Sequence, residues 1–225
     1  MLADPASVSL HAILQAPPAP DRPALVYGCG TLGLAAIALV RLLYPDTEVW
    51  AVARTRASAE LATKVGAARV LPSKPDELVQ RVADALPAAQ LRPWSGRAWL
   101  QDGPAVVYDM VGTPETIETA MRLADTGGWI VVAGVEPPKR FEWTPLYFKE
   151  LHLVGANAFG VEDVNGVRKH AFEHYFDFVR AGLDLTPLIT HRYPLTRWQD
   201  AVLAVANRAS TGSIKVLLEP GPPRR

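Results

Sequence analysis

The sequence has a single cysteine and no excess of either charge. Cys29 is the only cysteine among 225 residues, so neither a disulfide within the chain nor a cysteine-rich zinc site can form. Lysines and arginines number 23, as do aspartates and glutamates, so there is no basic field to attract nucleic acid or an anionic membrane. We therefore expect neither as a partner.

Long hydrophobic runs and targeting signals are also missing. The longest apolar run covers residues 32–40, which is too short to cross a bilayer. The first residues contain an aspartate and no basic segment, so they do not read as a signal peptide. With a lone cysteine, these features favour the reducing cytoplasm.

Short apolar runs alternate with helical patterns along most of the chain. Such alternation predicts an α/β Rossmann fold, a doubly wound parallel sheet with helices on both faces. Strands are predicted over residues 24–27, 48–53, 68–71, 105–109, 129–133, 151–155 and 214–218, and helices over 7–15, 31–43, 58–65, 75–86, 114–123, 167–181 and 198–207.

The expected organisation is a lead-in helix (1–16), a dinucleotide-binding domain (17–165), C-terminal helices with a strand (166–220) and a tail (221–225), which we expect to be disordered. Residues 87–104, which include Trp94 and Trp99, break the rhythm without clear periodicity. A stretch of this length is either a functional loop or an insertion.

Residues 28–33 form a glycine-rich turn of the pattern G-x-G-x-x-G, between a predicted strand and a predicted helix. In this context Gly28 permits a tight turn, Gly30 lets the backbone approach a pyrophosphate, and Gly33 lets helix and strand pack closely. Free N–H groups at the helix start, including those near Thr31 and Leu32, would bind the phosphates. Cys29 occupies the variable second position, and we give it no catalytic role.

The end of the second predicted strand indicates which dinucleotide is bound. A carboxylate there would accept the ribose 2′-hydroxyl of NAD, but the strand ends at Ala53 and runs into Arg54 and Arg56. Arginine pairs with a phosphate, so we predict NADP(H) over NAD(H), with Arg54 as the main contact and Arg56 as a second.

Several segments, in order, resemble the medium-chain (zinc-type) alcohol dehydrogenase superfamily. They are ADPASVSLHAI at the start, ALVYGCGTLGL at the turn, LATKVGAARVL, VVYDMVG, GGWIVVAGV, LITHRYPL and GSIKVLLEP. The resemblance implies that Val111, Gly112, Gly134 and Val135 meet the ribose and nicotinamide. We expect Asp109 to anchor local backbone amides rather than to catalyse.

The resemblance also implies that a GroES-like catalytic domain, which supplies zinc ligands and most of the substrate pocket, precedes this region in the family and is absent here. Asp4 matches the family's third zinc ligand, but an open catalytic zinc site needs three protein ligands. Zinc is therefore expected only if the missing ligands are supplied. His170 and His174 are spaced as a helical pair, and we interpret them as an ordinary helix face rather than as metal ligands.

The same resemblance implies that the C-terminal helix and strand are a remnant of the catalytic domain. Leu10, Ile13, Leu14, Val202 and Val205 would then lack their usual cover. It also implies a homodimer, joined through the edge strand near residues 151–155.

Three functions remain open. The first is NADP(H)-dependent hydride transfer between an alcohol and a carbonyl in the full-length context, with this chain alone weakly active or inactive and no catalytic residue assigned. The second is a non-catalytic NADP(H)-binding module or truncated subunit. The third is a different Rossmann enzyme, but no tyrosine has a lysine four residues later, as a short-chain dehydrogenase would need, and Ala53 argues against a methyltransferase. A flavin enzyme has only the glycine turn in its favour.

Overall fold

A six-stranded, entirely parallel sheet forms the centre of the molecule in a computed structural model that describes residues 1–93, 96–137 and 139–221. The strand order is that of the Rossmann fold. The sheet consists of two halves of three strands each, which meet between its first and its fourth strand in chain order. This confirms the predicted fold class. In spatial order the strands are β3 (Arg69–Leu71), β2 (Val49–Val52), β1 (Ala24–Tyr27), β6 (Val106–Asp109), β7 (Trp129–Val132) and β8 (His152–Gly155).

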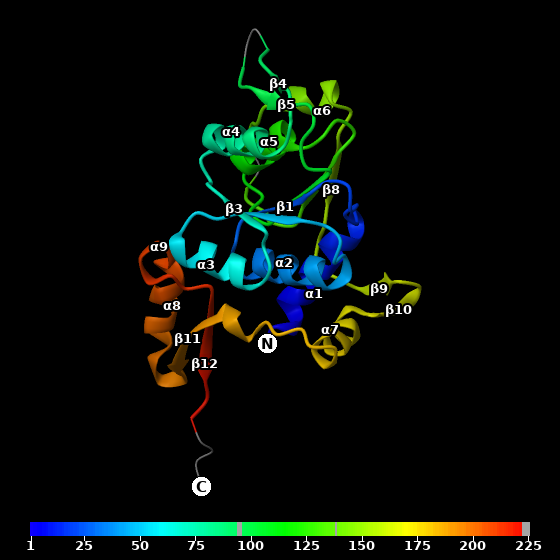
Figure 1. The fold of residues 1–225 in the computed structure, drawn as a ribbon. Coiled ribbons are helices and arrows are strands. Elements are labelled where there is room, and N and C mark those ends of the chain that lie inside the picture. The colour runs from blue at the N-terminus through cyan, green and yellow to red at the C-terminus, as the bar shows by residue number, and fades with distance from the viewer. Residues whose placement is uncertain (94–95, 138, 222–225) are drawn as a thin grey trace.

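Helices cover both faces of this sheet, as Figure 1 shows. Because side chains alternate along a strand, Val26 packs on one face and Leu25 on the other, and each joins a separate apolar cluster. One face carries α1 (Ala3–Gln15), α2 (Thr31–Leu43), α3 (Arg56–Lys64) and α7 (Ala171–Arg180); the opposite face carries α4 (Pro75–Ala85), α5 (Pro114–Leu123) and α6 (Thr144–Phe148).

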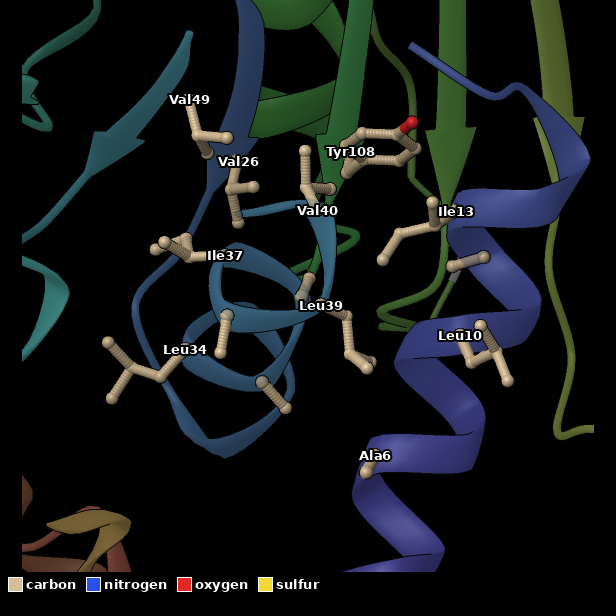
Figure 2. Packing of buried hydrophobic residues seen from close by; sticks show 14 of the residues in the cluster. Ala6, Leu10, Ile13, Val26, Leu34, Ile37, Leu39, Val40, Val49 and Tyr108 are labelled. Carbon is tan, nitrogen blue, oxygen red and sulfur yellow. The ribbon is translucent and has the colours of Figure 1, made fainter. Parts of the chain in front are cut away.

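Helix α2 is apolar on nearly all sides because it packs against both the sheet and α1, which lies beside it (Figure 2). Leu10 and Ile13 of α1 are at most 1% exposed, and the hydroxyl of Tyr108 donates to the carbonyl oxygen of Ala16 at 2.6 Å. The expectation that Leu10, Ile13 and Leu14 lack cover is therefore wrong: α2 and α7 cover the first two, and Leu14 is partly buried against the same apolar cluster. The expectation holds for Val202 and Val205, which are exposed.

The predicted helix over residues 167–181 is wrong in its first four residues. A hairpin of β9 (Val161–Val164) and β10 (Val167–His170) precedes α7. Asn165 and Gly166 have positive φ angles of 53° and 80°, as the tightest hairpin turns require. The Asn-Gly turn therefore directs residues 167–170 into a strand, although their sequence continues the helical pattern of α7.

A second unit lies beyond the sheet and reaches the side of α3 (Figure 1). Its two strands pair in parallel and support two short helices. It comprises η1 (Thr186–Leu188), β11 (Ile189–Pro194), η2 (Leu195–Arg197), α8 (Trp198–Ala206), α9 (Arg208–Thr211) and β12 (Lys215–Glu219).

The irregular stretch from residue 87 to residue 104 contains a small antiparallel pair, β4 (Gln90–Leu91) and β5 (Trp99–Leu100). Trp99 is buried there, and its ring meets that of Phe148 edge-on. Trp94 and the last four residues of the predicted tail lie outside the described residues. Within the described ranges, no helix combines the length and apolar character that crossing a bilayer requires.

Candidate cofactor site

A cavity of about 500 Å³ opens at the carboxyl ends of the central strands. Residues following β1, β2 and β6 line it, including Gly28, Arg54 and Val111. In open α/β sheets this crevice, where the strand order reverses, is where ligands bind. The remaining lining residues are Tyr27, Cys29, Gly30, Val52, Thr55, Ser58, Ser73, Met110, Thr113, Glu115, Thr116, Arg208, Gly212, Ser213 and Ile214.

The glycine turn has the geometry that its sequence predicts. Gly28 has φ +97°, a conformation that favours glycine, and a Cβ there would run into the side chain of Val111. A Cβ on Gly33 would lie 2.9 Å from the carbonyl carbon of Gly28 and closer still to its oxygen. A Cβ on Gly30 would meet no atom within 4 Å. Gly33 is thus required by packing, whereas Gly30 faces open space in the cavity.

Three helix N-termini converge on the cavity. Helix α2 begins after Gly30, which has no side chain to cap it, so its first N–H groups stay available for an anion. Helices α3 and α5 instead begin with capping boxes, in which Thr55 and Thr113 bind their own first turns. The α2 terminus is therefore the one suited to phosphate.

Asp109 holds the loop after β6, as expected from the sequence. One carboxylate oxygen accepts from the N–H groups of Val111 at 2.9 Å and Gly112 at 3.0 Å, and the other accepts from the Thr116 hydroxyl at 2.8 Å. Burial raises the pKa of the Asp109 carboxyl, while these hydrogen bonds oppose the rise. The residue shapes the cavity wall.

Burial raises the pKa of two titratable groups beside the glycine turn. Burial raises the pKa of the Cys29 thiol to about 12, and that thiol donates to the carbonyl oxygen of Val52. Burial, together with the charges of Glu115 and Asp109, raises the pKa of Tyr27 to about 12.

The predicted site residues other than Gly33 fall into three groups. Gly28, Gly30, Arg54 and Val111 line the cavity together. Ala53 is half-buried against the core, Arg56 is 93% exposed and pairs with Glu60 at 2.7 Å, and Val135 is 93% exposed.

The remaining four residues make contacts within the protein. The Thr31 hydroxyl donates to the carbonyl oxygen of Ile214 at 3.2 Å, and the carbonyl oxygen of Leu32 accepts from Ser9 at 2.9 Å. A Cβ on Gly112 would lie 2.7 Å from the nitrogen of Val135, and one on Gly134 would lie 2.6 Å from the nitrogen of Val111. Gly112 and Gly134 thus allow two loops to pack backbone against backbone.

The described residues do not form a zinc site by themselves. They contain no group of three His, Cys, Asp or Glu side chains that could hold a metal ion. Asp4 is exposed in the first turn of α1. The imidazole of His170 caps α7 by accepting from the Phe172 N–H, and His174 is buried with Nε2 3.1 Å from the carbonyl oxygen of Glu162. Neither histidine is oriented toward a shared metal.

Sequence reasoning missed the part of the cavity wall that the C-terminal unit supplies. Arg208, Gly212, Ser213 and Ile214 line the cavity although they lie far from the glycine turn in sequence. No local pattern marks them. Ser73 and Thr113, by contrast, follow parallel strands at the sheet edge where sites form, so their position could have identified them.

A parallel sheet in this order, with a glycine turn and an uncapped helix N-terminus over a crevice, defines a Rossmann-type nucleotide-binding fold. Residues 31–177 match the family model described as zinc-binding dehydrogenase. The chain belongs to this family, which confirms the resemblance seen in the sequence.

Relatives of the chain include L-threonine 3-dehydrogenase of Paraburkholderia phytofirmans, 27% identical over 205 residues, which are 87% of this chain and 50% of that protein. An alcohol dehydrogenase of E. coli CFT073 complexed with NADH has a TM-score of 0.77 at 20% identity, covering 96% of this chain and 57% of that one. A zinc-binding dehydrogenase of Sinorhizobium meliloti 1021 bound to NADP has a TM-score of 0.73 at 23% identity, covering 97% and 58%. The chain thus spans about half the length of the curated relatives it matches.

Proposed function

We propose that this chain binds NADP(H) in the cavity at the carboxyl ends of β1, β2 and β6. The observation that carries the proposal is the open space over Gly30 beside the uncapped start of α2, which suits a pyrophosphate. The cavity volume lies within the usual range for small-molecule sites. The structural neighbours that contain NADH and NADP support this class of ligand.

The preference for NADP(H) over NAD(H) rests on the residues that follow β2. Arg54 lines the cavity, and no ion pair engages its guanidinium within the described ranges. Arg56 instead pairs with Glu60 and lines a shallower adjoining hollow, so its contribution is secondary. A 2′-phosphate beside Arg54 would gain a charge-assisted pair.

The reaction proposed for the full-length context is hydride transfer between an alcohol and a carbonyl. A nicotinamide ring supplies the hydride chemistry, and the residues around Val111 would bind and orient it. Asp4 remains a proposed zinc ligand only alongside ligands from outside the described residues. A non-catalytic NADP(H)-binding module is the second candidate, favoured because these residues form no zinc site themselves.

We also propose that two copies associate through β8, one of the two outermost strands of the sheet, which has no strand beside it on its outer side within the described residues. Trp129 and His152 stack at this edge with ring centroids 4.1 Å apart, and both are partly exposed. The cytoplasm remains the proposed location, on the evidence of the lone cysteine.

Calorimetric titration of the chain with NADPH and NADH tests the proposal. We expect NADPH to bind more tightly, and Arg54→Asp to lower NADPH affinity by about tenfold or more, with little effect on NADH. Arg81→Asp makes the same charge change at an exposed position of α4, away from the cavity, and is the matched control. Failure of both cofactors to bind would overturn the proposal.

A further inference from the structure

The C-terminal unit contributes a second arginine to the cavity. Arg208, the first residue of α9, lines the same cavity as Arg54 although the two are 154 residues apart. Like Arg54, Arg208 forms no ion pair within the ranges that the structure describes. The lining residues include two that carry a positive charge, Arg54 and Arg208, and one that carries a negative charge, Glu115. The cavity is therefore charged to receive an anion.

Helix α9, which begins with Arg208, lies at one end of the cavity. A shallower hollow adjoins it, bounded by residues 55–57 and Glu60 on one side and residues 209–212 on the other. Thr55 and Gly212 line both hollows. Helix α9 thus lies against the first turn of α3, next to the residues that follow β2 (Figure 1). Glu115, in contrast, follows β6.

The backbone after α9 is held firmly at this place. The Ile214 carbonyl accepts from Thr31 in the first turn of α2, and the Ile214 N–H donates to the Thr190 hydroxyl at 2.9 Å. The buried Ser213 hydroxyl donates to the carbonyl oxygen of Ala204 at 2.7 Å. The loop that follows Arg208 is therefore fixed to both the glycine turn and the C-terminal unit.

We infer that Arg208 is a specificity-determining residue that, together with Arg54, binds the 2′-phosphate of NADP(H). The inference rests on the proposed cofactor function. Arg54 and Arg208 line the cavity from two independent elements, the β2–α3 turn and α9. A doubly charged phosphate can accept hydrogen bonds from two guanidinium groups at once. The C-terminal unit then serves as a second wall of the adenosine end rather than only as a remnant of another domain.

The test measures binding of 2′,5′-ADP and 5′-AMP, which differ only by the 2′-phosphate, to the whole chain. We expect Arg208→Ala to weaken 2′,5′-ADP binding by about tenfold and 5′-AMP binding by less than about twofold, since one charge-assisted pair is lost. Arg208→Lys keeps the charge and recovers part of the loss. Arg192→Ala removes a charge from the same unit without touching the cavity, and leaves both affinities unchanged.

A double-mutant cycle with Arg54→Ala completes the test. Because the two arginines would share one phosphate, we expect their effects on 2′,5′-ADP binding to be non-additive. Equal loss of both nucleotides in Arg208→Ala, or no loss of either, would overturn the role of Arg208 while leaving the cofactor site intact. Absence of binding by the unmodified chain to NADPH and to both probes would instead overturn the proposed function itself.

Discussion

Gly33 and Gly30 lie three residues apart in the same turn, but the structure predicts opposite consequences when each is replaced by alanine. A Cβ on Gly33 would come within 2.9 Å of the Gly28 carbonyl carbon, and the obstacle is backbone, which cannot rotate away. Relief requires α2 to move from β1, which disturbs the central apolar cluster. Overpacking of this kind costs about 1–3 kcal/mol, and we expect the upper end for Gly33→Ala.

Gly30→Ala is the matched control for stability. A Cβ at this position meets no atom within 4 Å, and φ −83° is open to any residue. We expect its free energy of unfolding to stay within about 0.5 kcal/mol of the unmodified chain, because a stiffer unfolded chain offsets a slightly poorer helix cap. The same methyl group projects into the space assigned to the pyrophosphate, so NADPH binding falls by about tenfold or more.

Urea unfolding followed by far-UV circular dichroism gives the two stabilities, and calorimetry gives the affinities. A Gly33→Ala variant as stable as the unmodified chain would show that the Gly28 carbonyl does not restrict this position. A Gly30→Ala variant that binds NADPH normally would show that the open space over Gly30 has no role in binding.

Two further predictions concern stability. Lys149 is buried and donates to the carbonyl oxygens of Met121 and Ala124 at the end of α5, and burial lowers its pKa from 10.5 to about 7. The unfolded chain therefore binds more protons between these values, and this group makes the free energy of unfolding rise by about 2 kcal/mol from pH 7 to pH 9. Lys149→Met should lose that rise relative to the unmodified chain in urea unfolding, and equal pH dependence in both would contradict the assignment. Gly166→Val forces a β-branched residue to φ 80° in the β9–β10 hairpin and should lower the melting temperature at a cost of about 1–2 kcal/mol, whereas Val167→Thr, at an exposed neighbouring position, should leave it nearly unchanged.

Local sequence signals predicted the elements nearest the glycine turn closely. The bounds predicted for β1, α2 and α5 agree with the structure, because a buried strand, a helix apolar on all sides and a proline in the first helical turn each leave a clear pattern. The apolar spacing from residue 167 onward predicts a helix, but the Asn-Gly turn makes residues 167–170 the second strand of the hairpin before α7.

The cavity wall shows where sequence reasoning stops. Gly28, Gly30 and Arg54 could be assigned because a fixed local motif places them at strand ends. Arg208 could not, since the position of α9 beside α3 depends on packing of the C-terminal unit rather than on any residue close to it in sequence. Likewise, the burial of Leu10 and Ile13 depends on α2 and α7, which meet α1 only in the folded chain.

The central claim is that a nicotinamide dinucleotide occupies the crevice over the glycine turn. Backbone amide resonances of the isotope-labelled chain, recorded during titration with NADPH, test this claim most directly. We expect shifts concentrated at Gly30, Arg54 and Val111 and at the Gly212–Ser213 turn, with residues of the β9–β10 hairpin unaffected. Saturating NADPH without shifts at Gly30 and Val111, or with shifts confined to other surfaces, would contradict it.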